Sequence, residues 1–336
     1  MRLNTHIEFE PFIPNLLLRN PHIQTVVGAS ARATTGITFR RERIDTPDGD
    51  FVDLDFADVQ GATWAQLGED KPIVLFLHGM EGNARSGAAH EIYRYLSRRG
   101  VRCVGLNLRS CSGELNRTPR SYHAGFTEDL ALVHNLLLDR YPNTPIGLVG
   151  ISLGANILLK YLGEGGESLV NRTLASVAIS PPFDLQRAQQ MLDNGLQRAY
   201  VQRFLYTLTA KITAQTDMLK DLVDVPQARK IRTMLAFDNL YTARLHGFKD
   251  AADYYAHSSC GQFLGAIRVP TLILRAVDDP FFDPADIPYG IIEHNPALTG
   301  VFPQYGGHVG FVEGTALTGF DYWAERQASR YLALMV

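Results

Sequence analysis

One serine lies in a pattern that is typical of nucleophilic serines. Ser152 has a glycine two positions before it and another two positions after it, in the run Gly150-Ile151-Ser152-Leu153-Gly154. An apolar run at 146–149 precedes this pattern and a helix-forming stretch at 157–162 follows it, so the serine falls on a strand-to-helix turn. Small residues at both glycine positions let the chain turn sharply and expose the hydroxyl. An ordinary turn with a helix-capping serine is the alternative interpretation.

A serine hydroxyl needs a neighbouring base, and the base needs an orienting carboxylate. In this arrangement the acid and then the histidine follow the serine along the chain. Asp278 and Asp279 follow the apolar run at 271–274. We predict that Asp279 is the acid, because it ends the turn immediately before a proline. His308 is the predicted base, since it follows the next strand candidate and the glycines beside it let its loop bend over the serine.

Acyl transfer also requires hydrogen-bond donors for the oxyanion that forms at the attacked carbonyl. The backbone N–H of Leu153, directly after the serine, is one predicted donor. The N–H of Met80 is the other, because it follows an early strand candidate in the segment His78-Gly79-Met80-Glu81-Gly82. His78 is a rival for the role of the base. It is less favoured, because it ends a buried strand on the oxyanion side and does not follow the acid.

Alternating strand and helix patterns predict an α/β fold. Two alternating stretches within 37–57 flank a Pro-Asp-Gly turn, which indicates a β-hairpin. Nearly continuous apolar runs then predict strands that are buried on both faces, at 73–77, 101–108, 146–149, 175–179 and 271–274. Segments with helical spacing separate the first four, at 88–96, 130–138 and 157–162. This order predicts a mostly parallel central sheet with helices on both faces.

The rest of the chain completes one predicted domain over residues 1–336, with an N-terminal arm at about 1–35. Residues 183–264 show helical spacing without a strand run, so we expect a helical cap inserted into the sheet order. Phe204 and Leu208 belong to this segment, and we expect apolar cap side chains of this kind to line an acyl-chain pocket. A weak strand candidate at 300–304 and a C-terminal helix at 315–334 follow.

Composition excludes several classes of protein. The 336 residues include 32 basic and 35 acidic side chains, so the excess of positive charge that nucleic-acid binding requires is missing. Three cysteines without CxxC spacing argue against a disulfide framework and a zinc site, and we expect neither a metal nor a cofactor. No run of 18 apolar residues occurs, which predicts a cytoplasmic protein without a transmembrane segment. Oligomeric state and peripheral membrane contact stay open.

A set of short motifs spreads over about residues 10–330. They are Asn20-Pro21-His22-Ile23-Gln24-Thr25, His78-Gly79-Met80-Glu81-Gly82, Ser112-Gly113-Glu114-Leu115-Asn116-Arg117, Ser121-Tyr122-His123, Gly150-Ile151-Ser152-Leu153-Gly154, Asp278-Asp279-Pro280-Phe281 and Gly306-Gly307-His308-Val309-Gly310-Phe311. Together they resemble the YheT-like branch of the α/β-hydrolase superfamily. The resemblance implies an α/β-hydrolase fold with a helical cap and a catalytic triad of Ser152, Asp279 and His308. One departure is Ser110, where relatives usually have glycine after the arginine.

We therefore expect a serine carboxylic-ester hydrolase that acts through an acyl-enzyme on short- to medium-chain acyl esters. Relatives in the branch that the chain resembles include yeast enzymes that make and cleave medium-chain fatty acid ethyl esters, and mammalian lipases. The expected partner is accordingly a small-molecule ester or a lipid-like substrate. Acyl transfer to an alcohol by the same triad and a non-catalytic scaffold are the alternatives. The motif at 20–25 has no chemistry that the sequence explains.

Overall fold

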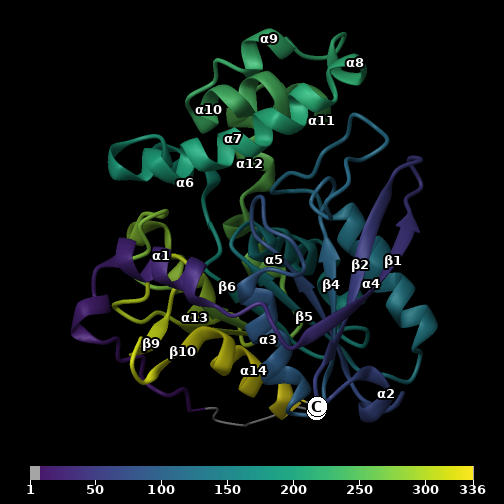
Figure 1. The fold of residues 1–336 in the computed structure, drawn as a ribbon, viewed down its shortest axis with the longest axis vertical. Coiled ribbons are helices and arrows are strands. Elements are labelled where there is room, and N and C mark those ends of the chain that lie inside the picture. Colours follow the sequence, from purple (N-terminus) through teal and green to yellow (C-terminus); the bar gives the residue numbers. More distant parts are fainter. Residues whose placement is uncertain (1–7, 336) are drawn as a thin grey trace.

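Eight strands form one sheet in the computed structural model, which describes residues 8–335 (Figure 1). The strand order is β1-β2-β4-β3-β5-β6-β7-β8. The strands are β1 (Ile37–Asp45), β2 (Phe51–Val59), β3 (Ile73–Leu77), β4 (Arg102–Asn107), β5 (Ile146–Ile151), β6 (Ser176–Ile179), β7 (Thr271–Leu274) and β8 (Leu298–Val301). β2 pairs antiparallel with β1 and β4, and every pair from β4 to β8 is parallel. The mostly parallel sheet predicted from the apolar runs is therefore confirmed.

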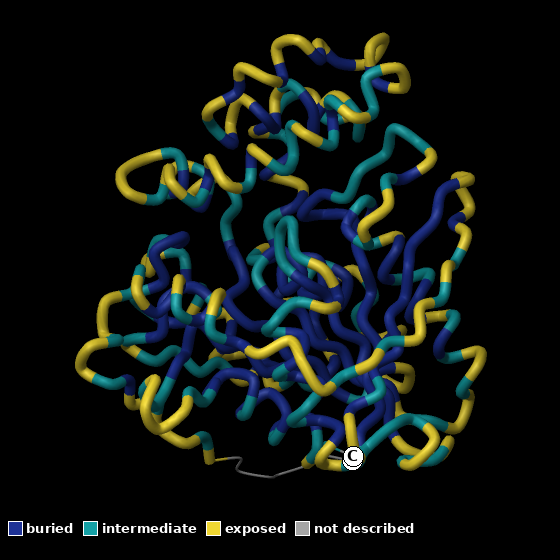
Figure 2. Tube along the Cα trace, in the orientation of Figure 1, coloured by how far each residue is buried: buried dark blue, intermediate teal, exposed yellow. Residues whose placement is uncertain are grey.

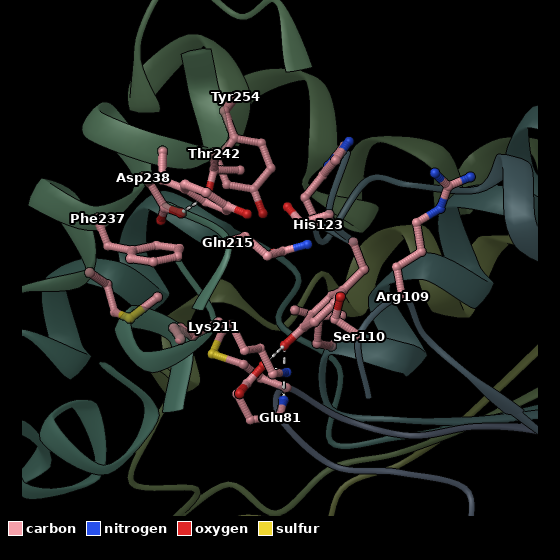
Figure 3. A pocket seen from close by; sticks show the side chains of 17 residues that line it. Glu81, Arg109, Ser110, His123, Lys211, Gln215, Phe237, Asp238, Thr242 and Tyr254 are labelled. Atoms are coloured by element: carbon pink, nitrogen blue, oxygen red, sulfur yellow. Dashed lines mark hydrogen bonds and ion pairs between the residues drawn. The ribbon is translucent and has the colours of Figure 1, made fainter. Parts of the chain in front are cut away.

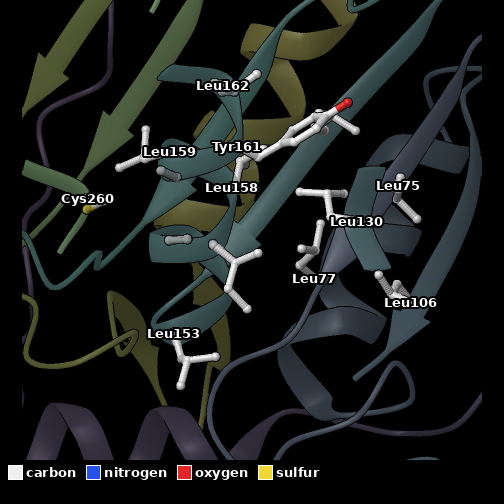
Figure 4. Packing of buried hydrophobic residues seen from close by; sticks show 14 of the residues in the cluster. Leu75, Leu77, Leu106, Leu130, Leu153, Leu158, Leu159, Tyr161, Leu162 and Cys260 are labelled. Carbon is white, nitrogen blue, oxygen red and sulfur yellow. The ribbon is translucent and has the colours of Figure 1, made fainter. Parts of the chain in front are cut away.

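Helices cover both faces of this sheet, because alternate residues of each central strand point to opposite sides. Leu75 and Leu77 of β3 pack with α4 (Glu128–Arg140), α5 (Leu153–Gly165) and α13 (Tyr289–His294). Figure 4 shows Leu77 beside Leu130 of α4 in this layer. Phe76 points the other way, toward α3 (Gly87–Ser97) and α14 (Trp323–Met335).

Five further elements lie outside the cap. They are η1 (Leu16–Leu18), α1 (Pro21–Ala31), α2 (Trp64–Leu67), η2 (Gly166–Leu169) and η6 (Pro284–Asp286). Figure 2 shows that burial is deepest along the central strands and that exposed residues gather on the connecting loops. No helix within residues 8–335 has the length and apolar character needed to cross a lipid bilayer.

The segment between β6 and β7 contains only helices and turns, and it stands above one end of the sheet in Figure 1. Its elements are α6 (Leu185–Leu192), η3 (Gly195–Gln197), α7 (Arg198–Ala214), α8 (Thr216–Leu219), α9 (Val225–Ala228), α10 (Met234–Phe237), the π-helical turn η4 (Asp238–Thr242), α11 (Ala243–His246), α12 (Ala251–Ser258) and η5 (Cys260–Ala266). We call residues 183–264 the cap. Val201, Leu205 and Phe237 are buried in an apolar cluster that holds these short helices together and also includes Phe281 and Phe282 of the loop after β7.

Two expectations near the C-terminus are wrong. β8 ends at Val301 and does not extend over 300–304, because it pairs only along the length of β7 and Pro303 has no N–H for a ladder. The segment predicted as a helix from 315 begins instead with a hairpin of β9 (Val312–Thr315) and β10 (Gly319–Tyr322). The hydroxyl groups of Thr315 and Thr318 each accept the other residue's backbone N–H, at 3.0 and 3.1 Å. These two bonds form a tight turn, which is incompatible with a helix at this position.

Helix α5, which begins directly after Ser152, packs very closely on η5. A Cβ on Gly163 would lie 2.6 Å from Phe263 Cβ and nearer still to the Phe263 carbonyl oxygen. Alanine normally stabilises a helix interior by about 1 kcal/mol relative to glycine. Here we expect the opposite sign, because the added methyl group has no space.

Gly163→Ala should lower the free energy of unfolding by about 1–3 kcal/mol through overpacking. Urea denaturation of the purified protein measures this change. Gly265→Ala is the matched control on the η5 side, because a methyl group there meets no atom within 4 Å. A Gly163→Ala variant as stable as the unmodified protein would contradict the packing described for α5.

Candidate active site

Ser152 occupies the sharp turn between β5 and α5. Its backbone has φ +53° and ψ −121°, a conformation that residues other than glycine rarely adopt. A Cβ on Gly150 would lie 2.5 Å from the Gly154 carbonyl oxygen, and a Cβ on Gly154 would lie 2.5 Å from the His78 carbonyl oxygen. Glycine is therefore required on both sides of the serine, as the sequence pattern indicates.

The structure brings Ser152, His308 and Asp279 into one hydrogen-bonded line. His308 Nε2 lies 2.9 Å from Ser152 Oγ, and His308 Nδ1 lies 2.8 Å from Asp279 Oδ2. Because an ionised carboxylate only accepts, Nδ1 carries the proton and Nε2 is left to accept from the serine hydroxyl. Asp279 Oδ1 accepts the Phe281 N–H at 2.9 Å, which fixes the plane of the carboxylate. The His308 ring also stacks on the Phe281 ring, with centroids 4.1 Å apart.

Asp278, the other candidate acid, does not reach His308. Its Oδ1 accepts the Gly307 N–H at 2.9 Å and so supports the loop that leads to the histidine. Burial raises the pKa of the Asp278 carboxyl to about 6. The two neighbouring aspartates therefore have different surroundings, and only Asp279 contacts the imidazole.

The loop after β3 lies directly against the serine. A Cβ on Gly79 would lie 3.0 Å from Ser152 Cβ, so this loop approaches as closely as a glycine allows. Neither the Met80 N–H nor the Leu153 N–H has a hydrogen-bond partner within residues 8–335. Both residues line the cavities that meet above the serine.

Two side chains that the sequence reasoning did not assign support this loop. The Tyr122 hydroxyl accepts the Glu81 N–H at 3.0 Å and donates to Glu81 Oε1 at 2.8 Å, which holds Glu81 at φ +54°. Lys211 of the cap forms an ion pair with Glu81 at 2.7 Å. Tyr122 belongs to one of the motifs on which the resemblance to the α/β-hydrolase superfamily rests, and that was the only available signal in the sequence. Nothing in the sequence points to Lys211.

His78 has a structural role and is not the base. Its Nε2 accepts the Leu108 N–H at 3.1 Å and its Nδ1 lies 2.7 Å from the Gly79 carbonyl oxygen, so both ring nitrogens are engaged away from Ser152. Burial lowers the pKa of the His78 ring to about 4. Within residues 8–335, no group of three or more His, Cys, Asp or Glu side chains has an arrangement that could hold a metal ion.

The loop after β4 explains the serine at position 110. Ser110, the position noted in the sequence as a departure from the resemblance, has φ +60°, in the left-handed region that favours glycine. Its hydroxyl accepts the Asn116 N–H at 3.0 Å, a bond that glycine cannot make. The serine therefore keeps the loop geometry and gains a side-chain bond that helps to hold it.

Two cavities meet between the cap and the core. The first, of about 640 Å³, contains Ser152 and is lined mainly by apolar cap and loop side chains, including Phe204. The second, of about 560 Å³, includes Leu208 (Figure 3). Figure 3 shows Glu81 and Lys211 toward one end of this second cavity and Asp238 toward the other. The two cap residues singled out in the sequence thus line different cavities.

Asp238 lines both cavities and lies in the π-helical turn of the cap. Burial raises the pKa of its carboxyl to about 6, although the carboxylate accepts from the Tyr255 and Thr242 hydroxyls, each at 2.7 Å. A buried acid in a π-turn has no sequence signal of its own, and the sequence reasoning did not find it. Its two hydroxyl partners explain how a carboxyl group is accommodated between apolar cavities.

Comparison with known proteins agrees with this architecture. The family described as alpha/beta hydrolase fold matches residues 72–315. The putative esterase YheT of Escherichia coli is 36% identical over 96% of this chain and 92% of its own length, and phospholipase ABHD3 of Mus musculus is 29% identical over 91% and 74%. The structure of the Pyrococcus furiosus esterase Pf2001 has a TM-score of 0.52 at 16% identity, covering 90% of this chain and 91% of that one, which is a likeness of fold. The chain therefore belongs to the α/β-hydrolase fold family, in the branch that includes YheT.

Proposed function

We propose that this protein is a serine carboxylic-ester hydrolase that acts through an acyl-enzyme. The observation that carries the proposal is the hydrogen-bonded line from Ser152 Oγ through His308 to Asp279. A hydroxyl beside a base, with a carboxylate behind that base, is the arrangement that makes an alcohol nucleophilic at neutral pH. The relatives named as an esterase and a phospholipase support an ester as the substrate.

In the first half of the proposed reaction, Ser152 Oγ attacks the ester carbonyl carbon while His308 Nε2 takes the hydroxyl proton. Asp279 stabilises the imidazolium that forms. The carbonyl oxygen becomes an oxyanion, which the N–H groups of Met80 and Leu153 bind. His308 then gives its proton to the leaving alcohol, and the acyl group stays on the serine.

Water completes the cycle by the same route. His308 takes a proton from the water as it attacks the acyl-enzyme, and the oxyanion forms again at the Met80 and Leu153 N–H groups. When this intermediate collapses, the proton returns to Ser152 Oγ and the carboxylic acid leaves. Beyond the ester and one water molecule, the proposed steps use only groups of this chain.

The substrate class follows from the walls of the cavity that contains Ser152. Phe204, Phe281 and Leu185 line it with other apolar side chains, which suit the hydrocarbon part of an acyl ester. Apolar walls favour acyl chains in proportion to the surface they bury, by about 0.8 kcal/mol per methylene group. We therefore propose short- to medium-chain acyl esters as substrates.

Replacing the nucleophile tests the proposal directly. Ser152→Ala should lower kcat on p-nitrophenyl esters by roughly 10⁴-fold or more, because the attacking oxygen is lost. A fluorophosphonate probe should label the unmodified protein and not the variant. Folded protein that resists the probe, or a Ser152→Ala variant that keeps its activity, would instead support a non-catalytic scaffold.

The two aspartates form a matched pair for testing the acid. Asp279→Asn should lower kcat by roughly 10⁴-fold, because the amide no longer stabilises the imidazolium. Asp278→Asn keeps an oxygen for the Gly307 N–H, so we expect a much smaller loss. Steady-state kinetics on one ester, with both variants checked for folding, measure the difference. Equal losses in the two variants would contradict the assignment of Asp279.

The acyl-chain site is tested by substitution in the cap. Phe204→Ala enlarges the cavity at Ser152 and should shift the kcat/KM preference toward longer acyl chains. Leu208→Ala, in the neighbouring cavity, should shift it less. A series of p-nitrophenyl esters graded by acyl length measures this preference. The same loss of activity at every acyl length, with normal stability, would refute the proposed site.

A further inference from the structure

The motif at 20–25, which the proposed reaction does not use, begins the helix α1. Asn20 caps this helix by accepting the N–H groups of His22 and Ile23, at 2.9 and 3.2 Å. The helix lies against the loop that carries His308. A Cβ on Gly28 would lie 2.7 Å from Gly310 Cα, so the helix and the loop touch backbone to backbone. Residues almost 300 positions apart thus form one contact surface.

The His308 loop has an unusual backbone that needs support. Gly306 and Gly307 have φ +149° and +58°, and Val309 and Phe311 have φ +55° and +44°. A residue other than glycine in such a conformation costs about 1–3 kcal/mol. Valine, which is β-branched, is especially disfavoured there. The loop therefore keeps its shape only because neighbouring groups hold it.

Helix α1 supplies several of those groups. Thr25 Oγ1 accepts the His308 N–H at 2.9 Å, and its own proton goes to the Pro21 carbonyl oxygen at 2.7 Å, which fixes the hydroxyl. The fully buried Gln24 side chain accepts the Val312 N–H at 2.8 Å and donates to the Val312 carbonyl at 3.1 Å. The helix thus holds the loop at His308 itself and again four residues later.

Arg32, which ends α1, continues this contact. Its Nη2 donates to the Val309 carbonyl oxygen at 2.7 Å and to the Gly310 carbonyl oxygen at 3.1 Å. The same guanidinium forms a buried ion pair with Glu325 of α14 at 2.6 Å. Arg32 therefore binds the carbonyl groups of two neighbouring residues of the His308 loop. Its ion pair with Glu325 connects this loop to the C-terminal helix.

A second line of contacts leads from α1 to the ring of His308. His22 Nδ1 lies 3.1 Å from the Tyr200 hydroxyl of the cap. The Tyr200 ring packs on Phe281, with centroids 4.8 Å apart, and Phe281 stacks on the imidazole. The helix therefore contacts the histidine's backbone directly and its ring through two aromatic side chains.

We propose that Thr25 and Gln24 are positioning residues that set where the His308 imidazole stands relative to Ser152. This inference rests on the proposed function, in which His308 is the base. Neither residue lines the Ser152 cavity, so each acts through the histidine loop. Removing the Thr25 oxygen leaves the His308 N–H unpaired and frees the loop to move. A displacement of about 1 Å at a catalytic group is enough to cost roughly 100-fold in rate.

The test compares three variants of one helix. Thr25→Val removes the oxygen at nearly constant shape, Thr25→Ser keeps it, and Ser30→Ala removes an exposed hydroxyl that bonds only to the Val26 carbonyl. We expect Thr25→Val to lower kcat by roughly 10- to 100-fold with KM unchanged. Thr25→Ser and Ser30→Ala should behave as the unmodified protein. Thr25→Ala, which removes the same oxygen without adding a methyl group, replaces Thr25→Val if that variant does not fold.

A spectroscopic measurement separates positioning from a merely structural role. The proton between His308 Nδ1 and Asp279 should give a downfield proton NMR signal, identified by its absence in His308→Ala. We expect this signal in the unmodified protein and in Thr25→Ser, and we expect it to be shifted or lost in folded Thr25→Val. A lower melting temperature with kcat and the signal both unchanged in the folded protein would overturn the proposal.

Failure of the proposed function gives a different result. If Ser152→Ala loses its activity while Thr25→Val keeps its kcat, the reaction stands and the positioning role is wrong. If Ser152→Ala stays active, the proposed reaction is wrong. The Nδ1 proton signal in Thr25→Val then decides by itself whether Thr25 holds the imidazole in place.

Discussion

The backbone of Ser152 is the constraint on which the rest of the site depends. At φ +53° the serine is held out of both the strand it follows and the helix it precedes. That conformation is possible only because Gly150, Gly154 and Gly79 leave no Cβ in the space around it. The buried apolar layers on both sides of β5 hold the strand and the helix firmly enough to impose it.

The same kind of strain recurs around the site. Within residues 8–335, the residues other than glycine with positive φ are Glu81, Ser110, Ser152, Ser180, Val309 and Phe311. The first four follow the carboxyl ends of β3, β4, β5 and β6, and the last two lie in the loop after β8. Each of the loops has side-chain support, as in the bond from the Val309 N–H to Ser180 Oγ at 3.2 Å. The fold therefore concentrates its unfavourable backbone where parallel strands end and polar groups converge.

The features that the sequence predicts correctly are those that require a particular pattern of side chains. The runs at 73–77 and 271–274 match β3 and β7, because a strand buried on both faces must be continuously apolar. The β9–β10 hairpin is short and polar and has no such pattern. Chain order and flanking residues together were enough to predict that Ser152, Asp279 and His308 are neighbours. The contacts of Thr25 and Gln24 are with backbone groups far along the chain, and those groups have no side-chain identity that a sequence could reveal.

Two of the contacts between the cap and the rest of the chain differ in kind. At the loop after β3 the contact is polar, through the ion pair of Lys211 with Glu81. On the histidine side it is aromatic, through Tyr200 on Phe281. A cavity lined mainly by apolar side chains contains Ser152. Because Glu81 belongs to the loop that packs on Ser152 and Phe281 stacks on His308, the cap helps to hold the surroundings of both residues in place.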